Sequence, residues 1–366
     1  MQIYRVVGLM SGTSLDGIDA AVLSTDGEGY ILREGFISVP YEDGLRARIR
    51  ACLNLPPERR AEAAAVEREL TEAHAAAIRQ LLAARGGSAG IDLIGFHGQT
   101  VAHDPARGYT CQLGDGAHLA ALTGLPVVND FRTPDVKAGG QGAPLAPVYH
   151  RALAAQLEKP CAFLNIGGVA NVTYVGEDGG ILAFDTGPGN ALIDDWMLQK
   201  TGQKYDKNGE AAASGRVDES VLADLMSHPF FAAKPPKSLD RNDFVSARWQ
   251  HLGVNEGAAT LTAFTVRAVA RAADFLPQKP RRWIVAGGGR LNAEMMHGLR
   301  SALGVPVNPI EDIGFDGDAI EAEAFAYMAV RSLRGLPISF PGTTGAPRDM
   351  TGGTLHHPRG KTAGAA

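Results

Sequence analysis

The residues best suited to chemistry in this chain lie in loops built from glycine, small hydroxyl residues and aspartate. The first such loop, Gly12-Thr13-Ser14-Leu15-Asp16-Gly17, separates two apolar runs at residues 6–10 and 18–23. This pattern predicts a β-hairpin whose tight turn leaves backbone N–H groups pointing outward, and such a nest of donors suits a polyphosphate. The same design returns between residues 163 and 175, around Gly167-Gly168. The sequence therefore predicts two related lobes that hold nucleotide phosphates.

An ordinary hairpin with a flexible turn is the alternative interpretation of either loop taken alone. A P-loop or a dinucleotide-binding loop would run directly into a helix. Residues 18–23 instead alternate between apolar and other side chains as a strand does. The first loop therefore belongs to neither of those commoner glycine motifs.

Asp185 is the strongest candidate for a catalytic group. It follows a predicted strand over residues 181–184 and precedes Thr186-Gly187-Pro188-Gly189-Asn190. Ligands of open α/β sheets bind where strands end, and the glycines would let a ligand approach closely. Asp185 is predicted to act as a general base toward an attacking oxygen. The alternative is an aspartate that only closes a turn or caps a helix.

Polar side chains at two other predicted strand ends suit a sugar. His97 and Gln99 can bond hydroxyl groups, although a lone histidine is also a common structural residue. Asp130 and Arg132 flank Phe131 and are expected on one face of an extended chain. Arg132 can clamp a carboxylate with two parallel hydrogen bonds, and a surface salt bridge is the alternative.

Three further features concern the nucleotide and its metal. The turn Gly287-Gly288-Gly289 permits close backbone approach to a base or ribose, or is simply a tight connection. Asp16 and Asp19 could hold Mg²⁺ directly or through water, or could satisfy the hairpin's own N–H groups. Glu321, at the start of the last predicted helix, either caps that helix or faces a ligand.

These loops need rigid elements to hold them, and the hydrophobic periodicity predicts alternating helices and strands. Such alternation indicates α/β lobes. Helices are predicted at residues 58–85, 117–123, 217–227, 256–276 and 318–334, and strands at residues 91–96, 110–113, 125–129, 181–184 and 283–286.

Composition sets the broad class. With 366 residues, 45% hydrophobic and 20% charged, the chain can build two ordinary soluble domains. A net charge of −5 without a basic run argues against nucleic acid as a partner. Three scattered cysteines predict neither a disulfide framework nor a metal site, and Cys111 and Cys161 are expected to be buried thiols. We expect no membrane segment and a cytoplasmic location.

Taken together and in order, the loops resemble the anhydro-N-acetylmuramic acid kinase family of the actin/hexokinase/Hsp70 superfamily. The resemblance extends over essentially the whole chain. It rests on the segments at residues 8–17, 96–100, 129–132, 140–145, 165–171, 185–190 and 287–289.

The resemblance implies two actin-like (ribonuclease H-like) α/β lobes with ATP bound in the cleft between them. The implied lobes are residues 1–127 with about 340–366, and residues 128–339. It implies that ATP contacts Gly12, Thr13, Ser14, Leu15, Asp16, Gly17, Ile18, Asp19, Gly167, Gly168, Gly287, Gly288 and Gly289. It further implies Asp185 as catalytic base and a sugar site that includes His97, Gln99, Asp130, Arg132, Gly187, Asn190 and Glu321.

The reaction that the resemblance implies is unusual for a kinase. The 1,6-anhydro bridge of the sugar leaves no free 6-hydroxyl, so the ring must open as phosphate transfers. ATP and Mg²⁺ would serve this step, the product would be N-acetylmuramic acid 6-phosphate, and the enzyme would be a cytoplasmic homodimer in cell-wall recycling. The chain departs from the family pattern at residues 239–244 and at Ile320. These departures bear on the local contacts that the resemblance implies, not on the reaction.

Two other functions fit the same loops. A conventional hexosamine kinase would use Asp185 to deprotonate a free hydroxyl. A sugar-independent ATPase of the same superfamily, either a chaperone or a filament former, would hydrolyse ATP without responding to any sugar.

Overall fold

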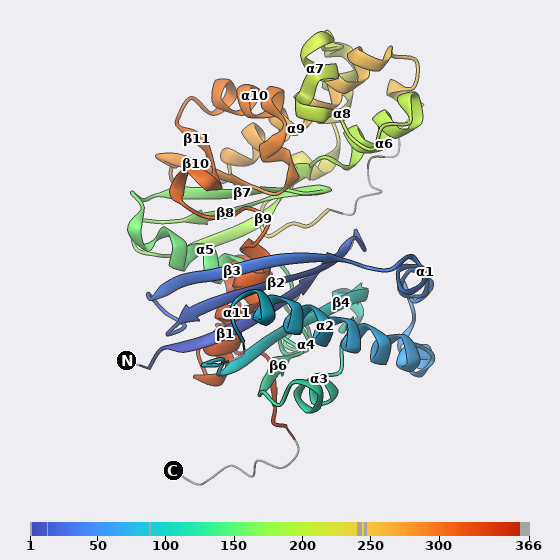
Figure 1. Ribbon diagram of the computed structural model, residues 1–366. Coiled ribbons are helices and arrows are strands. Elements are labelled where there is room, and N and C mark those ends of the chain that lie inside the picture. Colours follow the sequence, from blue (N-terminus) through green and yellow to red (C-terminus); the bar gives the residue numbers. More distant parts are fainter. Residues whose placement is uncertain (1, 13, 88, 240–243, 245–246, 359–366) are drawn as a thin grey trace. The chain divides into compact units, whose positions relative to one another are not determined.

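A computed structural model describes residues 2–12, 14–87, 89–239, 244 and 247–358 (Figure 1). The chain forms two compact units, Met1–Ala155 with Ala319–Ala366, and Gln156–Asp318. Each unit is built on one mixed sheet with helices. The expected α/β class is confirmed.

The division between the units differs from the boundaries expected near residues 127 and 340. Residues 128–155 and 319–339 belong to the first unit, not the second. The physical reason is strand and helix pairing: β6 (Val127–Asn129) pairs with β4 (Leu93–Asp104), and α11 (Ile320–Leu333) packs on the same sheet.

The first unit has a seven-stranded sheet in the order β12-β6-β4-β1-β2-β3, with β5 paired to β4. Its strands are β1 (Tyr4–Ser11), β2 (Gly17–Thr25), β3 (Ile31–Pro40), β4, β5 (Tyr109–Leu113), β6 and β12 (Thr354–His356). Its α-helices are α1 (Asp43–Ala51), α2 (Ala64–Ala84), α3 (Gly116–Thr123), α4 (Thr133–Lys137), α5 (Pro147–Leu153), α11 and α12 (Pro341–Thr344). The helix predicted at residues 58–85 begins as a 3₁₀ segment, Pro57–Ala63, before α2.

The second unit has a five-stranded sheet in the order β11-β10-β7-β8-β9. Its strands are β7 (Cys161–Ile166), β8 (Val169–Val175), β9 (Ile181–Pro188), β10 (Arg282–Ala286) and β11 (Val307–Pro309). Its α-helices are α6 (Ala191–Thr201), α7 (Glu210–Ser214), α8 (Glu219–Met226), α9 (Val254–Ala273) and α10 (Ala293–Leu303). Short 3₁₀ segments are η5 (Pro229–Phe231) and η8 (Gly288–Leu291).

The two sheets repeat one topology. In the first unit β1, β2 and β3 form an antiparallel meander, and β4 and β6 continue the sheet parallel to β1. In the second unit β7, β8 and β9 form the meander, and β10 and β11 continue the sheet parallel to β7. The predicted relation between the two halves is therefore seen in strand order, with each glycine loop at the first hairpin of its meander.

Close packing of α11 fixes the site-bearing strands of the first unit. A Cβ atom at Gly8 would lie 1.9 Å from the Ala322 carbonyl oxygen, and one at Gly95 would lie 2.2 Å from that of Phe325. Only glycine permits this approach of helix to sheet. The neighbouring Val7 and Ile94 point to the opposite face and join a core that includes α2.

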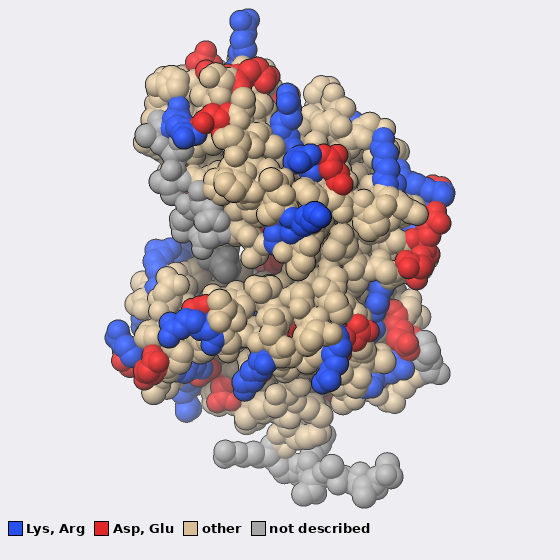
Figure 2. Space-filling view, turned by 180° about the vertical axis from the view of Figure 1, so that it is seen from behind, with Lys and Arg blue, Asp and Glu red and all other residues tan. Residues whose placement is uncertain are grey.

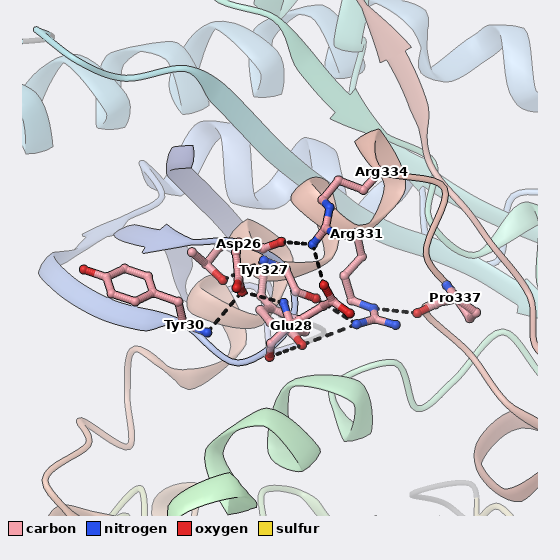
Figure 3. Close-up of polar contacts among 9 residues, drawn as sticks. Asp26, Glu28, Tyr30, Tyr327, Arg331, Arg334 and Pro337 are labelled. Carbon is pink, nitrogen blue, oxygen red and sulfur yellow. Dashed lines mark hydrogen bonds and ion pairs between the residues drawn. The ribbon is translucent and has the colours of Figure 1, made fainter. Parts of the chain in front are cut away.

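Polar contacts fasten the turn between β2 and β3 to the C-terminal end of α11 (Figure 3). The Asp26 carboxylate accepts hydrogen bonds from the Glu28 and Tyr30 N–H groups, at 2.8 and 3.0 Å. The Tyr327 hydroxyl donates to the Glu28 carbonyl at 3.0 Å, and Arg334 pairs with the Glu28 carboxylate at 2.9 Å. The β2–β3 turn is thereby joined to α11 by hydrogen bonds and an ion pair.

Charge is distributed without a basic patch on the face shown in Figure 2, where lysine and arginine are interspersed with acidic side chains. No helix in the described part of the chain is both long and apolar enough to cross a bilayer. Cys52, Cys111 and Cys161 are buried free thiols, as expected for the latter two.

Candidate active site

The first glycine loop connects β1 to β2 in a tight hairpin. Ser14 and Asp16 are exposed, whereas the side chains of Leu15 and Ile18 are buried. Leu15 has a φ of 60°, a left-handed conformation that is uncommon for leucine. Leu15 and Ile18 can therefore contact a ligand only through their backbone. Thr13 lies outside the described residues.

Buried and half-buried side chains support this loop through hydrogen bonds. Gln99 is fully buried on β4, donating from Nε2 to the Gly12 carbonyl at 3.0 Å and accepting from the Ser11 hydroxyl at 2.7 Å. The Ser11 hydroxyl is also bonded to the Tyr41 hydroxyl. Arg46 donates from Nε to the Leu15 carbonyl at 3.0 Å. Gln99 thus supports the loop, and both polar ends of its side chain are bonded within the protein.

Tyr41 and Arg46 are loop-supporting residues that sequence reasoning missed. Both lie more than twenty positions after the loop, and no motif marks them. Burial raises the pKa of Tyr41 to about 12, with the Ser11 hydrogen bond opposing and the Asp19 carboxylate adding to the shift. Tyr41 therefore stays protonated and acts as a fixed donor.

Arg132 is held in a defined orientation by two neighbours. Its Nε donates to His97 Nε2 at 3.1 Å, and its Nη1 donates to the Gly142 carbonyl at 2.8 Å. The structure shows no partner for Nη2 among the described residues, and the side chain is half-buried. Burial lowers the pKa of Arg132 to about 10, opposed by Glu321 and Asp135, so it remains a cation at neutral pH.

His97 orients Arg132 and has no free ring nitrogen. Its Nδ1 lies 2.7 Å from the Gly98 carbonyl, an acceptor, and Nε2 accepts from Arg132. These partners require the neutral tautomer with the proton on Nδ1. Burial, with the Arg132 charge adding, lowers the pKa of His97 well below 6.5. The strand β4 continues past His97 to Asp104, so the residue is not at a strand end as expected.

Asp130 and Arg132 do not share a face of an extended chain, which corrects that expectation. Asp130 has a φ of 57°, and Arg132 has helical dihedrals as the residue before α4. The backbone turns between them because α4 begins immediately afterwards. Asp130 is half-buried.

Glu321 interacts electrostatically with both Arg132 and Asp19. Glu321 is the second residue of α11, makes no capping bond and keeps an exposed side chain. The surrounding protein raises the pKa of Glu321, with the Arg132 charge opposing and the Asp19 carboxylate adding to the shift. Asp19 is half-buried on β2. One cation and two carboxylates of this unit are thus electrostatically connected through Glu321.

The acidic residues of this loop do not form a closed metal cage. The described residues contain no group of three or more His, Cys, Asp or Glu side chains able to hold a metal ion. Asp16 is exposed and Asp19 is half-buried, so these two carboxylates are not part of such a group.

The Asp135 carboxylate accepts several hydrogen bonds and so orders the glycine-rich segment that contains Gly142. Its side chain is 1% exposed, and Oδ1 accepts from the Gly142 N–H at 2.6 Å. Oδ2 accepts from the hydroxyls of Ser339 and Thr344, at 2.5 and 2.6 Å. Because Gly142 bonds Arg132, Asp135 connects the chain's C-terminal segment to the arginine.

We expect Asp135→Ala to lower the free energy of unfolding by about 3 kcal/mol or more, because several buried donors lose a charged acceptor. Chemical denaturation of the purified variants measures this. Asp43→Ala, at a carboxylate with a 100% exposed side chain, should change stability by less than about 0.5 kcal/mol. Equal effects of the two substitutions would contradict the role of Asp135.

In the second unit, three glycine-containing segments converge. Gly167-Gly168 form the turn between β7 and β8, and Asn190 donates from its side chain to the Ile166 carbonyl at 3.0 Å and from its backbone to the Gly167 carbonyl at 2.7 Å. Gly287 has a φ of +72°, and a Cβ there would lie 2.6 Å from the Ile166 carbonyl oxygen. The turn at residues 287–289 therefore packs directly against the second hairpin.

Arg290 is a further residue that sequence reasoning missed. Its side chain is 6% exposed, pairs with Glu311 at 2.7 Å and Asp318 at 3.0 Å, and donates to the Gly287 carbonyl at 3.1 Å. It holds the glycine turn in place. Asn292 is the N-cap of α10, and its side-chain oxygen accepts from the Met295 N–H at 2.9 Å.

Asp185 lies inside β9, not at its end, because β9 continues to Pro188. It is paired across the sheet with Asn171. Its Oδ2 accepts from the Leu239 N–H at 2.8 Å, and the structure shows no partner for Oδ1 among the described residues. Burial raises the pKa of Asp185 to about 6, with the Leu239 bond opposing. A carboxylate with that pKa suits a general base at neutral pH.

Gly187 has a packing role. It is buried with a φ of +154°, and a Cβ there would lie 2.7 Å from the Ala268 methyl group. The residue lets α9 approach β9. A direct sugar contact by Gly187 finds no support in this geometry.

The chain is similar in sequence to the proteins of one family over nearly its whole length. The family model described as anhydro-N-acetylmuramic acid kinase matches residues 4–358. A protein of that name from Rhizorhabdus wittichii is 56% identical over 359 residues, which cover 96% of this chain and 98% of its own. One from Methylobacterium nodulans is 52% identical over 378 residues, covering 97% of this chain and 100% of its own.

Two solved structures that the chain matches are much more distant in sequence. Component A of (R)-2-hydroxyglutaryl-CoA dehydratase from Acidaminococcus fermentans is 14% identical, with a TM-score of 0.47 over 89% of this chain and 99% of its own. Xylulose kinase from Lactobacillus acidophilus is 9% identical, with a TM-score of 0.47 over 97% of this chain and 94% of its own. The family match covers nearly the whole sequence, and the chain belongs to the anhydro-N-acetylmuramic acid kinase family.

Proposed function

We propose that this protein uses ATP and water to open the 1,6-anhydro ring of anhydro-N-acetylmuramic acid and to phosphorylate O6. The products are N-acetylmuramic acid 6-phosphate and ADP. Relatives of that name at 52–56% identity over nearly the full chain support the substrate. The reaction belongs to the recycling of cell-wall amino sugars.

The observation that carries the chemistry is the environment of Asp185. A single carboxylate, half-buried, with a pKa near 6 and one oxygen free of partners among the described residues, is suited to take a proton from water. Among the described residues, no charged side chain contributes to its pKa shift. One such group is sufficient if the leaving oxygen is captured by phosphate.

In the proposed step, Asp185 removes a proton from water as the water oxygen attacks C1 of the sugar. The C1–O6 bond breaks through an oxocarbenium-like transition state, as in glycoside hydrolysis. O6 then forms a bond to the γ-phosphorus while the bond to the β-phosphate oxygen breaks and ADP leaves. The phosphoryl group thereby replaces the proton that a general acid would supply. The transfer itself depends mainly on the positioning of the reactants and on neutralisation of the phosphate charge.

The phosphates of ATP are assigned to the two glycine hairpins. We assign contacts to Gly12, Thr13, Ser14, Leu15, Asp16, Gly17, Ile18 and Asp19 in the first unit and to Gly167, Gly168, Gly287, Gly288 and Gly289 in the second. Asp16 and Asp19 would hold Mg²⁺ directly or through water. When bound, the ion neutralises charge on the phosphates.

The sugar is assigned first to Arg132, whose Nη2 is available for the lactyl carboxylate. Asp130, Asn190 and Glu321 remain candidates for hydroxyl and amide contacts. His97, Gln99 and Gly187 are assigned indirect roles, because their polar groups or packing already serve neighbouring loops.

The direct test runs the reaction in ¹⁸O-water with anhydro-N-acetylmuramic acid and Mg²⁺-ATP. Mass spectrometry should find one ¹⁸O at C1 of the sugar phosphate for each ADP released. Phosphorylation of reducing hexosamines in place of the anhydro sugar would identify a conventional hexosamine kinase. ADP release that ignores every sugar would identify an ATPase of another kind.

We expect Gln99→Leu to raise the KM for ATP about tenfold, because the first loop loses two buried hydrogen bonds that hold Gly12 and Ser11. The KM for the sugar should change little. Gln112→Leu, at a half-buried glutamine on β5, is the matched control. Equal changes in both KM values would contradict a specific role in the nucleotide loop.

We also propose that the enzyme acts in the cytoplasm as a homodimer. Light scattering coupled to gel filtration would measure the mass of the assembly, and a monomeric mass would exclude the dimer.

A further inference from the structure

A short segment of backbone, Lys237 to Leu239, borders the edge strand β9 beside Asp185. The Lys237 carbonyl accepts from the Asp185 N–H at 3.0 Å, and the Leu239 N–H donates to Asp185 Oδ2 at 2.8 Å. The second bond is the only hydrogen bond that the structure shows for the Asp185 carboxylate among the described residues. The orientation of the carboxylate therefore depends on where this segment lies.

The segment is not part of a helix or strand, so its position needs another anchor. The Lys237 side chain supplies one. Its Nζ donates to the Phe230 carbonyl at 3.0 Å and lies 4.4 Å from the centre of the Phe230 ring. It also lies 4.6 Å from the Phe275 ring and 5.9 Å from the Phe184 ring. A cation among three rings is attracted to each ring face.

The three rings belong to separate parts of the second unit. Phe230 lies on η5, Phe275 follows α9, and Phe184 precedes Asp185 on β9. The lysine thus ties the segment to three packed elements at once. Because Phe184 and Asp185 are adjacent on a strand, their side chains point to opposite faces, so the ammonium group lies away from the Asp185 carboxylate.

We infer that Lys237 is a positioning residue for Asp185. The Lys237 side chain, held among the three aromatic rings, fixes the position of the segment at residues 237–239. The Leu239 N–H of this segment orients the Asp185 carboxylate. This inference rests on the proposed role of Asp185 as base. The ammonium group has no part in the chemical step, because it is turned toward the aromatic rings and the Phe230 carbonyl.

The charged surroundings agree with an anchoring role. Burial lowers the pKa of Lys237 to about 8, and the Arg271 charge on α9 adds to the effect. Arg271 is itself paired with Asp274 at 2.8 Å and lies over the other ring contact, Phe275, at 5.6 Å. Around Asp185, the cross-strand residue Asn171 is neutral. Lys237 is therefore a cation at neutral pH, and within the described part of the chain the Leu239 N–H is the hydrogen-bond donor that lowers the pKa of Asp185.

The test compares Lys237→Met with Lys237→Arg and with Lys234→Met, an exposed lysine of the same segment. In Lys237→Met the acid limb of the kcat profile should move up by about one pH unit, because the carboxylate loses a hydrogen bond that favours its charged form. We expect kcat at pH 7 to fall about tenfold with little change in the KM for ATP. Lys237→Arg should restore most of the activity, and Lys234→Met should match the wild type.

A second measurement does not depend on turnover. The difference in Tm between each protein and its Asp185→Asn counterpart, followed against pH, reports the pKa of Asp185 in the folded chain. That pKa should rise in Lys237→Met and stay near 6 in the Lys234→Met control. Lys237→Gln provides the same comparison if the methionine variant does not fold.

An unchanged acid limb and an unchanged pH dependence of the Tm difference in Lys237→Met would overturn the inference, even if the variant were less stable. Failure of the wild type to use the anhydro sugar would instead overturn the proposed function. The Tm series would then still decide whether Lys237 controls the ionisation of Asp185.

Discussion

Asp185→Asn is expected to lower kcat by about 10³-fold, because the amide cannot take a proton from the attacking water. The KM for ATP should change little, since the phosphate loops are intact. The measurement is ADP release with the anhydro sugar, combined with ¹⁸O incorporation at C1. Asn is nearly isosteric with Asp, and its side-chain oxygen can still accept from the Leu239 N–H.

The wild type should lose activity as the pH falls through about 6, where Asp185 becomes protonated. The residual activity of Asp185→Asn should lack this acid limb. A variant that retains most of the wild-type rate, or the same acid limb, would remove Asp185 from the role of base.

The same substitution should stabilise the protein at neutral pH. Burial raises the folded-state pKa of Asp185 from 3.8 to about 6, so between these values the folded chain binds a proton more strongly than the unfolded chain. Stability is therefore lost progressively as the pH rises through this window, and the loss persists above it. Asp185→Asn avoids the loss, which is at most about 3 kcal/mol. Its Tm should exceed that of the wild type at pH 8 and approach it near pH 4.

Arg132→Ala is expected to lower kcat/KM for the sugar about 100-fold, because a preoriented guanidinium that pairs with a carboxylate is removed. The KM for ATP should remain near the wild-type value. Steady-state kinetics with each substrate varied in turn measures both effects. Arg107→Ala, at an arginine with a 73% exposed side chain, is the control and should behave as the wild type.

A substrate analogue sharpens the Arg132 test. The 1,6-anhydro sugar that lacks the lactyl group should be used about 100-fold less well by the wild type, for the same lost ion pair. Arg132→Ala should use the two sugars almost equally. If the variant discriminates between them as strongly as the wild type does, the carboxylate binds elsewhere.

The sequence by itself determined the parts of this protein that depend on neighbours along the chain. Apolar alternation around two glycine turns predicted both hairpins, and their shared design predicted two related lobes. Asn292 was identifiable as a helix cap, because capping needs only a polar side chain and the next few backbone N–H groups. The ordered set of loops was also sufficient to identify the family.

Tertiary structure decided how the polar side chains are used. His97 orients Arg132 across 35 positions, Gln99 supports Gly12 across 87, and Asp135 reaches Ser339 across 204. A hydrogen bond requires partners within about 3 Å in a fixed orientation, which only strand register and helix packing bring about. Residue type and local spacing showed that these side chains could bind a ligand, but which of them are already occupied by the protein depends on contacts between distant segments.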